Sequence, residues 1–223
     1  MKKNDAIITV NPINLQVARI RIAGDSPLIM HRWSEKAKRE MLDKMTGKAI
    51  KEKGKARPLR EPVAEFIDSL YWMNGKPNEK TETGFEAAIA QGARFGFPVT
   101  AIKKAAISAA YRTGKTKDMA SIRGAFFIAG EGPEMLTEVK GGAPQMREDM
   151  VRIGKGVADI RYRGEFPNWY IDLEIKYDDE GIYTLEHIVN MINIGGFACG
   201  IGEFRPEKDG QYGMFHVESV PEK

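Results

Sequence analysis

Residues 195–215 read GGFACGIGEFRPEKDGQYGMF, with glycines recurring through a loop that runs into an apolar segment. Glycine reaches backbone conformations with positive φ and leaves room for another backbone to come close. The stretch therefore predicts a glycine-rich loop that leads into a final strand over Met214 to Val217. The glycines that give this loop its character are Gly200, Gly202, Gly210 and Gly213.

Three side chains between these glycines suit a nucleic acid. Arg205 and Lys208 supply positive charge for phosphates, and Tyr212 supplies a ring on which a base can stack. This combination predicts a polyanion with exposed bases as the ligand. A second interpretation stays open, in which the segment is a long hairpin connection and its glycines only satisfy turn geometry.

Hydrophobic periodicity predicts an α+β protein. Strands are expected over 15–22, 71–73, 125–129, 158–162 and 169–177, helices over 34–51, 62–70, 100–112 and 184–194, and loops over 51–62, 76–84 and 141–156. Ser34, Thr100 and Thr184 are the expected helix caps. The order strand, long insertion, helix, strands, helix, strand is that of a ferredoxin-like, RNA-recognition-type antiparallel sheet with helices on one face. We expect one domain over 1–223, with a basic helix-loop insertion at about 34–84.

Charge is distributed unevenly along the chain. Residues 31–60 contain eleven Lys or Arg against four Asp or Glu, whereas residues 164–223 contain four against twelve. We interpret the first segment as a basic patch that binds a polyanion. The second is a surface that could meet the basic region of another copy. Alternatively, the lysine run is a solvated helix followed by a loop.

Composition excludes several classes of protein. The 223 residues contain no apolar run long enough to span a bilayer. A signal peptide needs an apolar stretch near the start of the chain, and Asn4 and Asp5 interrupt it. We therefore expect a cytoplasmic protein. The single cysteine, Cys199, excludes an internal disulfide and a multi-cysteine zinc site. We predict no metal and no cofactor. The three histidines are far apart in the sequence, P-loop and nucleophile-elbow motifs are absent, and the clusters of Asp and Glu are better explained as turns and exposed loops.

Four segments carry a resemblance to a known family: Gly24 to Leu28, FPVTAIKKAA from Phe97 to Ala106, RGEFP from Arg163 to Pro167, and the loop from Gly200 to Phe215. They resemble, in turn, the first strand-to-loop passage, a helix start, the strand entry and the C-terminal glycine-rich loop of the RAMP superfamily. Its members are the backbone and processing proteins of CRISPR effector complexes. Lys104 stands where that helix start usually has glycine. The whole sequence also resembles proteins of tailed phages.

This resemblance implies a sequence-tolerant protein that binds single-stranded RNA or DNA without catalysis and forms a homo-oligomer or filament along the strand. Phosphate and stacking contacts are common to RNA and DNA, so both stay open. The implied phosphate contacts are Arg32, Lys103, Lys104, Arg147, Arg152, Lys155, Arg205 and Lys208, and the implied stacking rings are Trp33 and Tyr212. Gly200, Gly202, Gly210 and Gly213 would admit the sugar-phosphate backbone.

Two other functions stay open. RNA-processing members of the resembled superfamily use a histidine from an early helix as general base, which makes His31 the candidate of a metal-independent endoribonuclease. A histidine two residues from a tryptophan is otherwise a common packing residue. The third function is a protein-interaction module that imitates a CRISPR backbone subunit.

Overall fold

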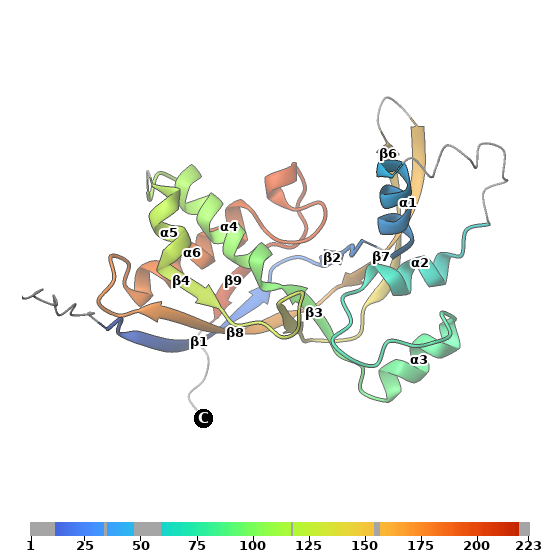
Figure 1. Cartoon of the computed structure of the whole chain (residues 1–223), viewed down its shortest axis with the longest axis horizontal. Coiled ribbons are helices and arrows are strands. Elements are labelled where there is room, and N and C mark those ends of the chain that lie inside the picture. The colour runs from blue at the N-terminus through green and yellow to red at the C-terminus, as the bar shows by residue number, and fades with distance from the viewer. Residues whose placement is uncertain (1–11, 34, 47–58, 117, 154–156, 219–223) are drawn as a thin grey trace, which may run out of the picture.

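The computed structural model describes residues 12–33, 35–46, 59–116, 118–153 and 157–218 (Figure 1). Over these ranges the chain is a mixed α+β protein with six α-helices and several antiparallel sheets. The helices are α1 (Glu35–Met45), α2 (Pro62–Ser69), α3 (Glu82–Ala90), α4 (Val99–Arg112), α5 (Met119–Ala125) and α6 (Leu185–Ala198), with a 3-10 turn η2 (Pro206–Lys208). The strands are β1 (Leu15–Gly24), β2 (Leu28–Met30), β3 (Phe95–Pro98), β4 (Phe126–Ile128), β5 (Leu136–Val139), β6 (Gln145–Ile153), β7 (Val157–Phe166), β8 (Tyr170–Asp178) and β9 (Phe215–Glu218).

The largest sheet has four strands in the order β4-β8-β1-β9, and every neighbouring pair is antiparallel. The chain enters it as β1, crosses as α4, returns as β4 and β8, crosses again as α6 and ends as β9. Each helix therefore connects two strands that have a third strand between them. β1 alternates as the sequence predicts, because Ile20 and Ile22 pack into the core while Arg19 and Arg21 lie on the opposite face.

Helices α4 and α6 cover one face of this sheet (Figure 1). The alanines of α4 let the two helices come close, and a Cβ on Gly195 would lie 2.8 Å from the backbone nitrogen of Ala106. The next residue, Gly196, lies against the carbonyl oxygen of Phe215 in β9. The Gly195-Gly196 pair thus lets α6 pack directly against both α4 and the edge strand.

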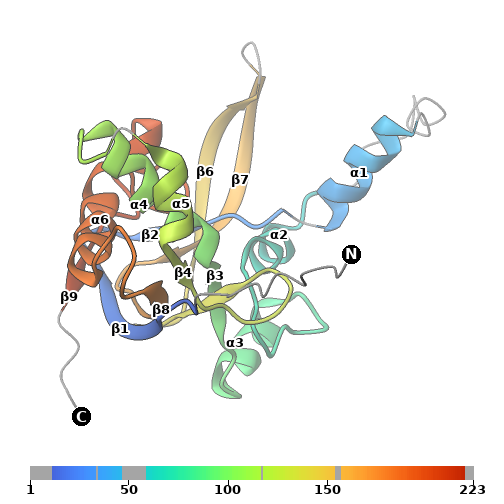
Figure 2. The ribbon, with the colours of Figure 1, turned by 60° about the vertical axis from the view of Figure 1, so that its left-hand side comes forward.

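Two smaller sheets extend the fold beyond this layer. β3 pairs with β5, and β2 pairs with one strand of a long β6–β7 hairpin. Helix α2 packs on β7, where a Cβ on Gly164 would collide with Leu70. Figure 2 shows the β6–β7 hairpin and α1 as two separate projections from the body.

Most predicted elements are confirmed. β1, β4, β7, β8 and β9 lie where alternation predicts strands, and α2, α4 and α6 lie where periodicity predicts helices. Thr184 caps α6 by accepting a hydrogen bond from the backbone N–H of His187 at 3.3 Å. Helix α4 begins at Val99 after Pro98, so the prediction of Thr100 as its cap is wrong.

Three predictions of local structure are wrong for identifiable reasons. The predicted loop at 141–156 contains the strand β6. β6 carries many charged residues and pairs with β7, which is also rich in charged residues, so the sequence of β6 shows no alternation of apolar and polar residues. The predicted strand at 71–73 is a single bridge between Trp72 and Phe95. The short elements α3, α5, β3 and β5 were not predicted, and α3 begins inside the predicted loop at 76–84.

Some predictions fall outside the described residues. These are the cap Ser34, the site residue Lys155 and residues 51–58 of the predicted basic loop. Within the described ranges, no helix combines the length and apolar character that a bilayer crossing requires.

Two glycine-to-alanine substitutions in helices test the packing of α6. Gly196→Ala should lower the free energy of unfolding by about 1–3 kcal/mol, because its new methyl group would overlap the Phe215 carbonyl. Gly124→Ala in α5 should instead raise it by up to about 1 kcal/mol, because no heavy atom lies within 4 Å of that Cβ position. Urea unfolding of both variants measures the difference. Equal effects would contradict the α6–β9 contact.

Candidate nucleic-acid interface

The glycine-rich loop is joined by backbone hydrogen bonds to the segment that follows β1 and contains β2. The N–H of Gly213 donates to the carbonyl of Pro27 at 2.8 Å, and the N–H of Glu203 donates to the carbonyl of Ile29 at 2.9 Å. Within the loop, the N–H of Ile201 donates to the carbonyl of Gly213 at 2.9 Å. Pro27 and Gly213 lie in two of the segments on which the predicted family resemblance rests, so these two segments are in direct contact.

The four loop glycines are required by the chain's own packing. Gly200, Gly202 and Gly213 have φ values of 63°, 81° and 64°, in the left-handed region that favours glycine. A Cβ on Gly202 would lie 2.5 Å from the Ile29 carbonyl oxygen, and Cβ atoms on Gly210 and Gly213 would collide with the carbonyls of Phe204 and Ile201. The close backbone approach predicted for a ligand is thus made by the protein itself. These glycines shape the site from within.

A cavity of about 400 Å³ opens beside this loop. One wall is the start of α4, with Thr100, Ala101, Lys104 and Ala105, and the opposite wall is the loop from Gly200 to Glu207. Its remaining lining residues are His31, Tyr71, Phe97 and Pro98. The volume lies in the range of small-ligand sites. Five predicted site residues meet here: His31, Lys104, Gly200, Gly202 and Arg205.

His31 is partly buried at this cavity. Burial lowers the pKa of its imidazole, and the positive charge of Arg163 lowers it further. Burial also raises the pKa of Tyr71, with a further contribution from the carboxylate of Glu134. Both rings are therefore uncharged at neutral pH, so His31 is able to accept a proton.

The two lysines of the predicted helix start lie on different sides of α4. Lys104 is exposed and lines the cavity. Lys103 turns away, where its Nζ donates to the carbonyl of Arg123 at 2.7 Å and lies 4.2 Å from the ring centroid of Phe127. Burial lowers the pKa of Lys103. Of this pair, only Lys104 lines the cavity.

Arg205 is committed to the loop. Its guanidinium donates to the Gly202 carbonyl at 2.9 Å and to Glu207 at 3.0 and 3.1 Å. Burial acts to raise the pKa of Glu207, but hydrogen bonds from Arg205 and the charges of Arg112 and Lys104 outweigh it and lower the pKa. Arg205, which is predicted to contact phosphate, therefore stabilises the conformation of the loop through these hydrogen bonds.

Tyr212 and Arg147 contact each other. The Arg147 guanidinium lies 4.7 Å from the Tyr212 ring centroid, and it also binds Asp149 at 2.7 Å and Glu165 at 3.4 Å. Desolvation opposes the charge of Arg147, yet hydrogen bonds with Asp149 and Tyr212 raise its pKa. The residue predicted to stack a base and one predicted to bind phosphate thus join the loop to the hairpin.

Arg163 of the RGEFP segment lies under the loop. It is 5% exposed, binds Asp149 at 3.2 Å and Glu203 at 3.5 Å, and sits 5.0 Å from the ring centroid of Phe204. Phe204 has φ 51°, a strained backbone conformation for an aromatic residue. Arg163, which lies in a third segment quoted for the predicted family resemblance, therefore contacts Glu203 and Phe204 of the same loop.

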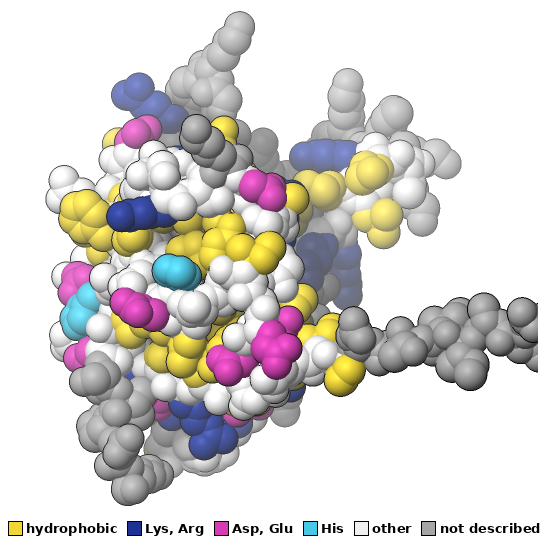
Figure 3. Space-filling view, turned by 90° about the vertical axis from the view of Figure 1, so that its left-hand side faces the viewer, with side chains coloured by type: hydrophobic (Ala, Val, Ile, Leu, Met, Phe, Trp, Pro, Cys, Tyr) yellow, Lys and Arg dark blue, Asp and Glu magenta, His cyan; other side chains and the backbone are white. Residues whose placement is uncertain are grey.

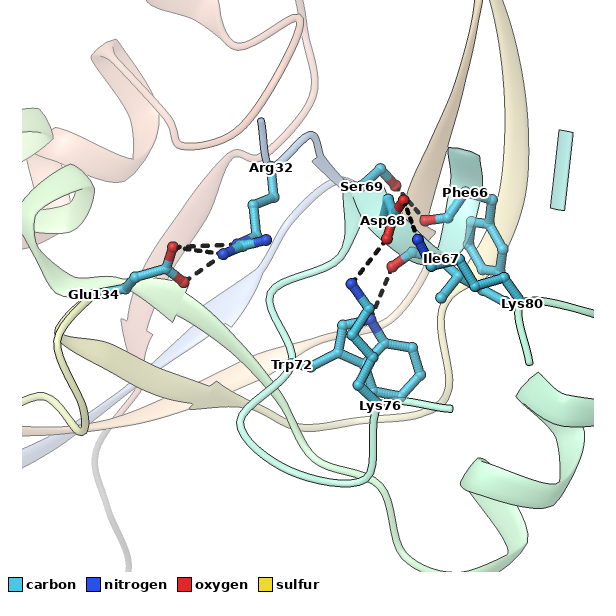
Figure 4. A network of polar contacts seen from close by, with 9 residues as sticks. All are labelled: Arg32, Phe66, Ile67, Asp68, Ser69, Trp72, Lys76, Lys80 and Glu134. Carbon is cyan, nitrogen blue, oxygen red and sulfur yellow. Dashed lines mark hydrogen bonds and ion pairs between the residues drawn. The ribbon is translucent and has the colours of Figure 1, made fainter. Parts of the chain in front are cut away.

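Arg32 and Trp33 lie directly before the insertion in the sequence, and Figure 4 shows Arg32 with its partner Glu134. The Arg32 guanidinium binds the carboxylate of Glu134 at 3.0 to 3.3 Å, and its backbone N–H donates to the carbonyl of Ser69 at 2.7 Å. Ser69 is buried at the end of α2 and its hydroxyl accepts from Gly164 in β7. Trp33 is 55% exposed. Of these two predicted contacts, Trp33 has the more accessible surface.

Two further predicted cations are exposed. Lys208 lies in η2, beyond the cavity, and Arg152 lies on the β6–β7 hairpin. They do not line the cavity. If they bind phosphates, the strand must run beyond the cavity over both elements.

The open face of the main sheet is less suited to a polyanion. Asp172 binds Arg21 at 2.7 Å and Lys140 at 3.0 Å, and Glu174 binds Arg19 at 3.4 Å. These carboxylates neutralise the arginines that would otherwise attract phosphate. The interface is therefore better placed on the helix side.

The surface at the left end of the molecule in Figure 1 differs from the open face of the sheet in the side chains that it exposes (Figure 3). Hydrophobic side chains fill much of its centre, and Asp and Glu side chains surround them. The segment that leads into α6 illustrates this, because Asp178, Asp179 and Glu180 precede Ile182, which is 84% exposed. Such a surface suits a protein partner more than a phosphate backbone.

No group of three or more His, Cys, Asp or Glu in the described ranges is arranged to hold a metal ion. A comparison of the sequence with protein-family models finds no match, and a comparison with curated proteins finds no similar sequence. The case for function therefore depends on the geometry of the site.

Sequence reasoning missed several residues of this site. Tyr71 lies in a segment predicted as a strand, and the predicted loop contacts Arg205, Lys208 and Tyr212 do not include the carboxylates Glu203 and Glu207 that line the cavity. Arg163 was available as a signal, because it belongs to a segment quoted for the resemblance. Its role depends on the partners Glu203 and Phe204, which lie some forty residues away in sequence.

The lowered pKa of His31 predicts a pH dependence of stability. The unfolded imidazole titrates near 6.5 and the folded one below it, so the unfolded state binds more protons between the two values. The contribution of His31 is thus fully present above about pH 6.5 and is lost as the pH falls toward the folded pKa. Urea unfolding from pH 7.5 to 5.5 should show a steeper loss for the wild type than for His31→Gln. Parallel curves would contradict this assignment.

Proposed function

We propose that this protein binds single-stranded RNA or DNA along the surface between α4 and the glycine-rich loop. The exposed ammonium of Lys104 neutralises phosphate at the cavity, and Lys208 and Arg152 extend the contact in both directions. The binding is sequence-tolerant along most of the strand, because phosphates carry no sequence information.

The topology supports this proposal. Strand order β4-β8-β1-β9 with α4 and α6 on one face matches a ferredoxin-like, RNA-recognition-type fold with insertions after β1 and after β4. Fold alone does not define function. It does agree with the RAMP-like segments, and these segments supply the site.

One observation carries the proposal. Of the four segments that carry the predicted family resemblance, two line one cavity and the other two contact the loop that forms a wall of this cavity. Pro27 binds the loop at Gly213, Lys104 faces the loop across the cavity, and Arg163 holds the loop from below. A loop that served only as a hairpin connection would not need all three of these contacts.

Assembly of copies along the strand is part of the proposal. Helix α1 exposes Met41, Leu42 and Met45 beside its basic residues, and the opposite end of the molecule is acidic and apolar (Figure 3). This charge complementarity favours a second copy as the partner of α1. Sedimentation of the wild type and of Met45→Glu tests it: equal, monomeric behaviour of both would contradict the assembly.

Lys104→Ala and Lys103→Ala form a matched pair that tests the binding surface. Both remove one charge from the same helix, but only Lys104 lines the cavity. Lys104→Ala should weaken binding to all sequences alike and leave the melting temperature nearly unchanged. Lys103→Ala should lower stability and leave affinity unchanged, because it loses the hydrogen bond to Arg123. Fluorescence anisotropy with labelled oligonucleotides measures affinity, and the reverse pattern would place the ligand elsewhere.

The salt dependence of binding tests the electrostatic part of the proposal. Each phosphate neutralised on a single strand contributes about −0.7 to the slope of log K against log salt. Contacts at Lys104, Lys208 and Arg152 predict a slope of about −2 per protomer, and Lys104→Ala should reduce its magnitude by about 0.7. A slope near zero would contradict phosphate binding. Failure to bind any oligonucleotide would favour the protein-interaction module.

Endoribonuclease activity is a second candidate, favoured by the place of His31. Its neutral imidazole lies in the same cavity as Lys104, an arrangement that supplies a base and a cation. Cleavage of labelled RNA in EDTA that is abolished in His31→Ala would establish it. Intact RNA after incubation with the wild type would contradict endoribonuclease activity, and nucleic-acid binding would be the remaining proposal.

A further inference from the structure

The charges that line the cavity point to a more specific ligand than a phosphate. Lys104 and Arg205 contribute two positive charges, and Glu203 and Glu207 contribute two negative charges. His31 is neutral because burial lowers its pKa. A phosphate placed among these groups would meet two carboxylates as well as two cations, so the four charges together offer it no net attraction. The interior of the cavity therefore suits an uncharged, polar group, with Lys104 at its exposed edge.

The carboxylates of Glu203 and Glu207 differ in their remaining capacity to accept hydrogen bonds. Glu207 is 13% exposed and takes hydrogen bonds from both Arg205 and Arg112. Glu203 is 39% exposed, and the Nη2 of Arg163 is 3.5 Å from its Oε2, which is long for a hydrogen bond. A carboxylate has about four acceptor positions on its two oxygens. Glu203 thus keeps the capacity to accept from a ligand.

The rest of the wall supplies flat and apolar surface. His31, Tyr71 and Phe97 bring rings to the cavity, and Pro98 and Ile201 add aliphatic contact. An aromatic heterocycle with hydrogen-bond donors is the part of a nucleic acid that fits such a wall. Phe204, directly after Glu203, is held in its strained conformation over Arg163, and such strain is concentrated at functional sites.

We propose that the cavity takes one unstacked guanine of the bound strand, and that the carboxylate of Glu203 accepts hydrogen bonds from its N1–H and N2–H. This inference rests on the proposed function. Among the bases, guanine alone presents two adjacent donors on its pairing edge, and these match the two oxygens of a carboxylate. Cytosine and adenine offer one amino group beside an acceptor, and uracil offers a single N–H between two acceptors.

Inosine is the probe for this site, because its base differs from guanine only by the missing N2 amino group. Binding is measured by fluorescence anisotropy with the full chain and uracil oligonucleotides that carry one central guanine, inosine, adenine or cytosine. The wild type should bind the guanine strand about tenfold more tightly than the inosine strand, as expected for the loss of one of the two hydrogen bonds to the carboxylate. Thymine oligonucleotides with the same central bases extend the test to DNA.

Glu203→Gln should abolish the difference between guanine and inosine, because an amide offers one acceptor and turns a donor toward the base. Because the substitution also removes a negative charge beside the bound strand, the comparison is made between the guanine and inosine strands within each variant. Glu174→Gln is the matched control: Glu174 is 36% exposed and pairs with Arg19 at 3.4 Å, on the open face of the sheet. This control should keep the guanine preference. Thermal melting confirms that both variants are folded.

The outcomes separate this inference from the proposed function. Equal affinity of the wild type for guanine and inosine strands, with measurable binding to both, would overturn the guanine site and leave nucleic-acid binding intact. A guanine preference that survives Glu203→Gln would overturn the assignment to Glu203. Failure of every oligonucleotide to bind would overturn both proposals.

Discussion

The backbone contact between the glycine-rich loop and the segment after β1 is the constraint on which the site depends. The carbonyl of Ile29 accepts from Glu203 and lies so close to Gly202 that no side chain fits there. Because this contact fixes the loop beside the start of α4, a cavity remains between them. Arg163 and Tyr212 then tie the loop to the hairpin. Loss of the first contact would remove one wall of the cavity and the support for the others.

The distribution of charge partners narrows the positions at which a nucleic acid can be bound. Several cations that the sequence offers are engaged within the protein, Arg32 with Glu134, Arg147 with Asp149 and Arg205 with Glu207. Such pairs order the fold and add little net attraction for a distant phosphate. Lys104, Lys208 and Arg152 are exposed, at the start of α4, in η2 and on the β6–β7 hairpin. The proposed interface consequently depends on few exposed cations and on the shape of the cavity.

The sequence predicts the central fold well because periodicity records burial. Alternation in β1 and β8 and the alanine-rich face of α4 reflect contact with one core, so their patterns are strong. β6 belongs to the hairpin that projects from the body, and most of its described residues are exposed, so its sequence resembles that of a loop. Short strands such as β3 and β5 depend on each other across forty residues, and nothing local encodes that pairing.

The candidate site was predicted in part for the same reason. The family resemblance points to His31 and Lys104, and turn signals point to the loop glycines, because both are carried by short local segments. They do not show which side of α4 Lys103 faces, nor that Tyr212 contacts Arg147 or that Glu203 lines the cavity. Those facts come from side chains that meet only after folding. The sequence thus identifies the segments of the site, and the fold assigns their roles.

The most direct measurement is a photo-crosslink between the protein and a single-stranded oligonucleotide that carries 4-thiouridine, with the crosslinked peptides identified by mass spectrometry. The account predicts crosslinks in residues 97–105 and 200–212, the two walls of the cavity and the loop beyond. Crosslinks confined to β1 and β8, on the open face of the sheet, would contradict it.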